Sequence, residues 1–137
     1  MKGVVFTTFL EMVEDTFGDV VADKMITDSG VASGGAYTAV GYYDPSEFGL
    51  LATALSAQVG DSVPNLVIRF GQHLAGTLAA GYPMAFEPFD SVLGLLARLD
   101  DAIHPEVLKL YPDAELPRFT TLSESEEHVT LLYQSKR

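Results

Sequence analysis

Histidine is the side chain in this sequence best suited to bind a metal ion, and the chain has three. His104 differs from the others because it lies nearly three helical turns after Leu93, on what would be the same apolar stripe if one helix ran through both. A neutral imidazole in such a place is either a metal ligand or a hydrogen-bonded core histidine, and the sequence leaves both open. Pro105 disfavours helical geometry at His104, so we expect a kink or a break there.

The other two histidines favour simpler interpretations. His73 lies beside the apolar stripe of its helix, and His128 follows Glu126 and Glu127 at the start of a strand. We expect a helix-surface position for the first and a solvated position for the second. The sequence contains no Ser-His-Asp order, no zinc-protease motif and no phosphate-binding loop, so it predicts no catalytic residues and a protein that is not an enzyme.

A second polar group closes the chain. Tyr133, Ser135 and Arg137 alternate, and in a β-strand they would share one face. A phenol, a hydroxyl and a guanidinium in a row suit an anionic group such as a pair of carboxylates. An ordinary polar edge strand is the alternative, which the residues alone favour.

The hydrophobic spacing predicts the elements that would position these residues. The first stripe, Phe6 to Phe17, ends at Gly18, and Asp44-Pro45-Ser46-Glu47 is a helix-start signal. We expect helices over about 6–17, 19–28, 45–60 and 62–81, another from about 90, and strands over 117–122 and 128–133. Helices followed by strands indicate an α+β domain, with helices packed on a C-terminal antiparallel sheet.

Composition limits the classes of function. A length of 137 residues favours one domain, and a net charge of −11 disfavours nucleic acid and anionic membranes as partners. No stretch is long and apolar enough to span a bilayer, and no signal peptide is evident, so we expect a cytoplasmic protein. Without cysteine, any iron or haem must be held by other side chains.

Several motifs in order along the whole chain resemble the H-NOX (haem nitric oxide/oxygen binding) family, which is related to the haem sensor domain of soluble guanylate cyclase. The most specific are Asp-x-Ile-His, ending at His104, and the final Tyr-x-Ser-x-Arg. The others are Met1-Lys2-Gly3, Tyr43-Asp44-Pro45-Ser46, Phe70-Gly71, Tyr111-Pro112 and Leu116-Pro117.

The resemblance implies one haem-binding domain over residues 1–137, with a distal helical part over about 1–60 and a proximal part over about 61–137. It implies haem b, with His104 as the axial ligand of the iron and Pro117 pressing on the porphyrin. Hydrogen bonds to the haem propionates are implied for Tyr133, Ser135 and Arg137. Distal positions are implied for Val5, Phe9, Leu74 and Leu78.

These distal side chains contain no hydrogen-bond donor, so the resemblance implies a sensor of nitric oxide, and also of carbon monoxide, that discriminates against dioxygen. In the family, the signal passes through weakening of the iron–histidine bond and a shift between the two parts, to a separate histidine kinase or cyclic-di-GMP enzyme. Family members continue past Tyr-x-Ser-x-Arg, so we expect a truncated chain with an incomplete sheet. The alternatives are a haem-free interaction domain and, less favoured, a haem peroxidase, for which no distal His–Arg pair is readable.

Overall fold

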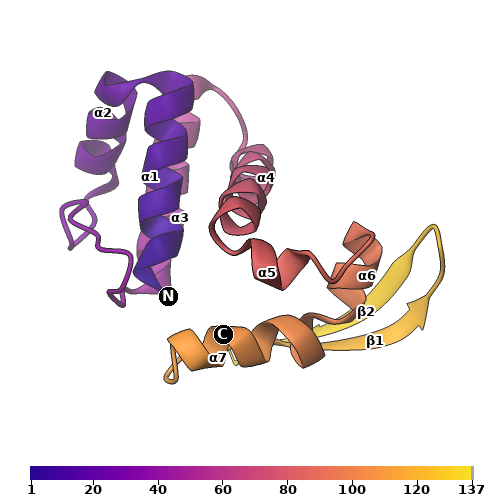
Figure 1. The fold of residues 1–137 in the computed structure, drawn as a ribbon. Coiled ribbons are helices and arrows are strands. Elements are labelled where there is room, and N and C mark those ends of the chain that lie inside the picture. Colours follow the sequence, from indigo (N-terminus) through magenta and orange to yellow (C-terminus); the bar gives the residue numbers. More distant parts are fainter. Residues whose placement is uncertain (137) are drawn as a thin grey trace. The chain divides into compact units, whose positions relative to one another are not determined.

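A computed structural model describes residues 1–136 of the chain, apart from the side chain of Leu110. The fold divides into two compact units, Met1–Leu78 and Ala79–Arg137. Each unit is described separately below. The first is helical, and the second combines short helices with a β-hairpin (Figure 1).

Four helices supply the regular structure of the first unit, and all four were predicted. They are α1 (Gly3–Phe17), α2 (Asp19–Ser29), α3 (Pro45–Val59) and α4 (Val63–Gly81), of which the last ends just inside the second unit. Helix α1 ends where Gly18 adopts a φ of 88°, a conformation that residues with a side chain rarely reach. Helix α3 begins as predicted, because the carboxylate of Asp44 accepts a hydrogen bond from the backbone N–H of Ser46. Within residues 1–136, no helix is long and apolar enough to cross a membrane.

Aromatic rings fill the centre of the first unit. Helix α2 contacts both α1 and α3, and the buried side chains of the helices meet in one apolar cluster. In this cluster the ring of Phe9 is fully buried, with its centroid 4.9 Å from that of Phe48 and 5.3 Å from that of Phe70. The other fully buried large side chains are Phe6, Val13, Met25, Leu51, Leu55 and Leu66.

A buried carboxylate holds the loop between α2 and α3 against this core. Glu47 is only 8% exposed, and its Oε2 accepts hydrogen bonds from Ser33 Oγ at 2.5 Å and from Tyr37 Oη at 2.6 Å. These two bonds lower the pKa of Glu47 below its usual value. Burial, together with the bond to the carboxylate, raises the pKa of Tyr37 to about 12. The loop is therefore tied to α3 by an ionised carboxylate and a neutral phenol.

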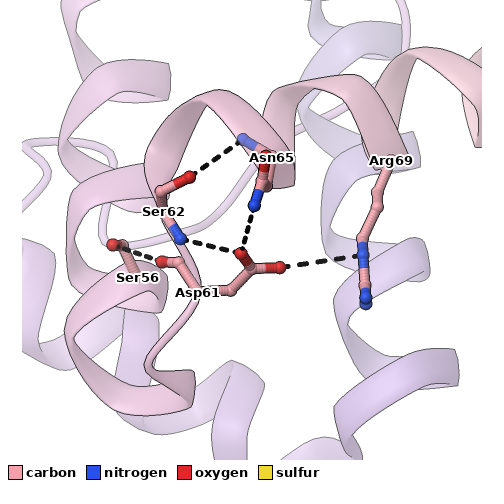
Figure 2. A network of polar contacts seen from close by, with 5 residues as sticks. All are labelled: Ser56, Asp61, Ser62, Asn65 and Arg69. Atoms are coloured by element: carbon pink, nitrogen blue, oxygen red, sulfur yellow. Dashed lines mark hydrogen bonds and ion pairs between the residues drawn. The ribbon is translucent and has the colours of Figure 1, made fainter.

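A second polar network sets the start of α4 (Figure 2). Asp61 accepts hydrogen bonds through Oδ1 from the Ser62 backbone N–H at 2.8 Å and from Asn65 Nδ2 at 2.9 Å. Its backbone carbonyl accepts from Ser56 Oγ on α3, and its Oδ2 lies 3.7 Å from Arg69 Nε. The network joins the end of α3 to the first two turns of α4. It therefore fixes the orientation of the start of α4 relative to the end of α3.

The second unit contains shorter helices than the sequence suggested. They are α5 (Pro83–Phe86), α6 (Val92–Ala97), a π-helical segment η1 (Leu99–Ile103) and α7 (His104–Leu110). The break expected at His104 is wrong in position, because the helical path is interrupted after Ala97, whereas His104 has αR backbone angles (φ −60°, ψ −38°) where η1 passes into α7. Pro105 is accepted there because it lies in the first turn of α7, where its missing N–H costs no helical hydrogen bond. Helix α5 was not predicted. Its only local start signal is Pro83 at the first helical turn.

A β-hairpin completes the second unit (Figure 1). Strands β1 (Arg118–Glu124) and β2 (Val129–Gln134) pair antiparallel, with an irregularity between Thr121 and Ser123. Helix α6 contacts both strands and η1 contacts β1. Thr121 Oγ1 also donates a hydrogen bond to the carbonyl oxygen of Ala97 at 2.9 Å. The predicted α+β architecture, with helices packed on an antiparallel sheet, is confirmed.

Candidate functional site

His104 is the first residue of α7 and follows the π-helical turn directly. It is therefore not on one continuous helix with Leu93, because the α-helical path is interrupted at Ala97. The π-helical turn is wider than an α-helical one, and such turns are frequent at functional sites. The side chain of His104 is 16% exposed, so the imidazole is mostly but not completely removed from solvent.

The partner of His104 is a carboxylate rather than the aliphatic surroundings that the sequence suggested. His104 Nδ1 lies 2.9 Å from Oδ1 of Asp100, four residues earlier. An ionised carboxylate can only accept hydrogen bonds, so Nδ1 carries the proton in this contact. In the neutral ring the lone pair of Nε2 is then free. This is the usual arrangement of a metal-binding histidine, whose other ring nitrogen donates to a carboxylate or a carbonyl.

Asp100 also connects the histidine to the hairpin. The same Oδ1 atom accepts a hydrogen bond from the backbone N–H of Phe119 in β1 at 3.0 Å. The ring of Phe119 lies next to the imidazole, with 5.8 Å between centroids. Across the hairpin, Phe119 is paired with Tyr133 of β2, and these two rings are 5.3 Å apart. The structure therefore brings two predicted site residues, His104 and Tyr133, into contact with the same phenylalanine.

The predicted alternation at the end of the chain is wrong in one respect. Strand β2 ends at Gln134, so Ser135 lies just outside the strand. Arg118 and Gln134 form the last pair of the hairpin at this end. Arg137 lies outside the described residues.

Ser135 instead helps to line a cavity of about 260 Å³ next to the start of the hairpin. The other lining residues are Ala114, Glu115, Leu116 and Lys136. Pro117 follows this lining segment directly and is half-buried. Polar and apolar groups thus meet where the chain enters β1 and leaves β2.

The four predicted distal residues belong to the first unit. Phe9 is fully buried, Val5 and Leu74 are half-buried against the same core, and Leu78 is half-buried near the end of α4. Their side chains have no N–H or O–H group. Any small molecule that they contact meets an apolar surface.

The family model described as Haem-NO-binding matches residues 2–137. The chain belongs to the H-NOX family. The family consists of haem-based gas sensors, and the match includes both the His104 segment and the closing Tyr-x-Ser-x-Arg motif. No curated protein matches the chain.

Solved H-NOX structures agree with the fold. The unliganded Fe(II) protein of K. algicida has 38% sequence identity and a TM-score of 0.90, with 99% of this chain and 74% of that chain covered. The Fe(II)CO protein of Shewanella woodyi has 40% identity and a TM-score of 0.81, with 100% and 72% covered. The Fe(II)NO protein of S. oneidensis has 26% identity and a TM-score of 0.85, with 99% and 75% covered.

The remaining histidines of this H-NOX chain have other surroundings than His104. His73 is half-buried and, with Arg69 and Met12, lines a separate cavity of about 320 Å³ in the first unit. His128 is exposed in the hairpin turn, where its Nδ1 lies 2.8 Å from Ser125 Oγ. Neither is paired with an acidic side chain in the described residues, in contrast to His104.

Two residues of the candidate site were missed by the sequence analysis. Asp100 could have been found, because its spacing of four residues before His104 allows contact on a helix. Phe119 could not, since its position depends on the pairing register of β1 with β2.

Proposed function

We propose that this chain is a haem-based nitric oxide sensor that binds haem b through His104. The observation that supports this most directly is the hydrogen bond from Nδ1 to Asp100, which leaves Nε2 as the available donor atom. This nitrogen of His104 would hold the haem iron. The bound haem would supply ferrous iron as the gas-binding centre.

The surrounding residues fit such a cofactor. His104 is 16% exposed, so its ring is both screened from water and reachable. Tyr133 and Ser135 offer hydroxyl donors for the two propionates, and Arg137 adds a guanidinium suited to carboxylates. Pro117, half-buried at the start of the hairpin, would press on the porphyrin face.

The proposed preference for nitric oxide rests on the distal residues. Bound dioxygen carries partial negative charge and is stabilised by a hydrogen-bond donor, whereas nitric oxide and carbon monoxide do not need one. The distal set contains no donor, and it consists of Val5, Phe9, Leu74 and Leu78. Two of the relatives were solved with nitric oxide or carbon monoxide, the gases that do not need a donor.

We further propose that the chain signals and does not catalyse. Its partner would be a separate histidine kinase or cyclic-di-GMP enzyme, as the family resemblance implies. In this arrangement residues of about 1–60, together with Leu74 and Leu78 of α4, would form the distal part, and residues of about 61–137 would hold the histidine. A change at His104 would be passed on through the residues that contact it.

The test is the visible absorption spectrum of the reduced, haem-reconstituted chain before and after addition of nitric oxide or air. We expect a Soret band that shifts with nitric oxide and does not shift with air. His73→Gln is the matched control, since it removes another half-buried histidine and should leave the spectrum unchanged. A stable dioxygen adduct would refute the gas preference, and a chain that retains no haem would refute the proposal.

A further inference from the structure

One carboxylate oxygen at the candidate site faces two donors from different elements. Asp100 belongs to η1, His104 begins α7, and Phe119 is the second residue of β1. Oδ1 of Asp100 lies 2.9 Å from His104 Nδ1 and 3.0 Å from the Phe119 backbone nitrogen. A histidine side chain and a strand backbone are therefore joined through a single atom.

We propose that Asp100 is a positioning residue that fixes the tautomer of His104 and fastens the imidazole to strand β1. The inference rests on the proposed role of His104 as the axial ligand and specifies how that ligand is prepared. Through its bond to the Phe119 N–H, Asp100 would also transmit a displacement of His104 to strand β1.

The fixed tautomer follows from the hydrogen-bonding capacity of the groups. If the proton of the neutral ring were on Nε2, a lone pair on Nδ1 would face a lone pair on Asp100 Oδ1 at 2.9 Å. With the proton on Nδ1, the same distance is a good hydrogen bond. The carboxylate therefore keeps Nε2 unprotonated, and a charged acceptor also strengthens the donor power of the ring toward a metal.

The connection to β1 has two parts. The shared oxygen bonds the Phe119 N–H, and the Phe119 ring packs against the imidazole at 5.8 Å. If His104 moves away from Phe119, Asp100 cannot keep both bonds at 2.9 and 3.0 Å. If Asp100 follows His104, the bond from the Phe119 N–H lengthens, and this amide becomes easier to exchange with solvent.

The tautomer can be read without haem. We would label the histidines of the full apo chain with ¹⁵N and record long-range ¹H–¹⁵N spectra, which distinguish the protonated ring nitrogen from the bare one. The expected result for the wild-type chain is that Nδ1 of His104 is protonated and Nε2 is not. A wild-type spectrum in which Nε2 of His104 carries the proton would overturn the proposal, whatever any variant does.

Variants then test the connection to β1. In Asp100→Ala, we expect mixed tautomers of His104, about tenfold faster exchange of the Phe119 amide, and about tenfold faster haem loss from the reconstituted chain. Asp100→Asn should retain the tautomer, because its amide oxygen can accept both bonds, and should lose haem at an intermediate rate. Asp90→Asn is the control, since it removes the same charge at an exposed position of the second unit, and it should change neither the His104 tautomer, nor Phe119 exchange, nor haem loss.

The outcomes separate this inference from the proposed function. A folded Asp100→Ala chain with an unchanged tautomer and unchanged Phe119 exchange would refute the positioning role. If the wild-type chain has the expected tautomer but retains no haem, the proposed function is the part that fails.

Discussion

Replacing Phe119 with alanine should loosen His104 and the hairpin together. The ring forms two aromatic pairs, with His104 at 5.8 Å and with Tyr133 at 5.3 Å. Such pairs contribute about 0.5–1.5 kcal/mol each, or about 1–3 kcal/mol for both. Because the ring is half-buried, the lost apolar contact adds about 1 kcal/mol. We expect the second unit of Phe119→Ala to be destabilised by about 2–4 kcal/mol.

Hydrogen exchange followed by NMR can measure this change in the hairpin alone. The amides of β1 and β2 should exchange faster in Phe119→Ala, while those of α1 and α3 in the first unit keep their wild-type rates. Leu122→Ala is the control, because Leu122 is in the same strand but is 62% exposed, and it should have little effect. Haem loss should be faster in Phe119→Ala and unchanged in Leu122→Ala. Equal exchange rates of the hairpin amides in the two variants would mean that the contacts of Phe119 with His104 and Tyr133 do not stabilise the hairpin.

Three further predictions concern other parts of the chain. His104→Gly should remove the axial nitrogen while external imidazole restores the wild-type spectrum; a spectrum unaffected by the substitution would show that another group holds the iron. Glu47→Gln should lower the free energy of unfolding by about 1–2 kcal/mol at pH 7, measured with urea, because both hydroxyl donors lose a charged acceptor. The folded-state pKa of Glu47 is lowered, so its contribution is complete above the usual value of 4.5 and is lost as pH falls through the folded-state value. The difference between Glu47→Gln and wild type should therefore close in acid, and a constant difference down to pH 2 would contradict this assignment. Ser135→Ala should lose haem about threefold faster, the effect of one hydrogen bond; equal rates in a haem-transfer assay would exclude Ser135 from the propionate site.

Local signals were sufficient for the helices of the first unit. The Asp44-Pro45 start of α3 and the Gly18 end of α1 depend only on backbone conformations and caps that neighbouring residues determine. The interruption after Ala97 was not readable, since Pro105 lies in the first turn of α7, where a proline is tolerated. Helix α5 was missed because four residues contain too little periodic pattern to recognise.

The candidate site was less readable, because its geometry depends on pairing between distant segments. The sequence singled out His104 and Tyr133 separately, but only the register of β1 with β2 brings Phe119 next to Tyr133. In the same register the last pair is Arg118 with Gln134, so Ser135 lies outside the strand. Register results from the packing of whole strands and turns, and short motifs do not encode it.

The distribution of buried side chains has a consequence for how long the protein survives in a cell. All of the fully buried apolar residues found in the described part of the chain belong to the first unit, whereas the described apolar side chains of the second are half-buried or exposed. A ligand that binds only the folded form adds its binding free energy to stability. With the proposed cofactor on His104, the second unit would gain much of its protection from that cofactor, and the haem-free chain would be the preferred substrate of cellular proteases. The abundance of the sensor would then follow the supply of haem.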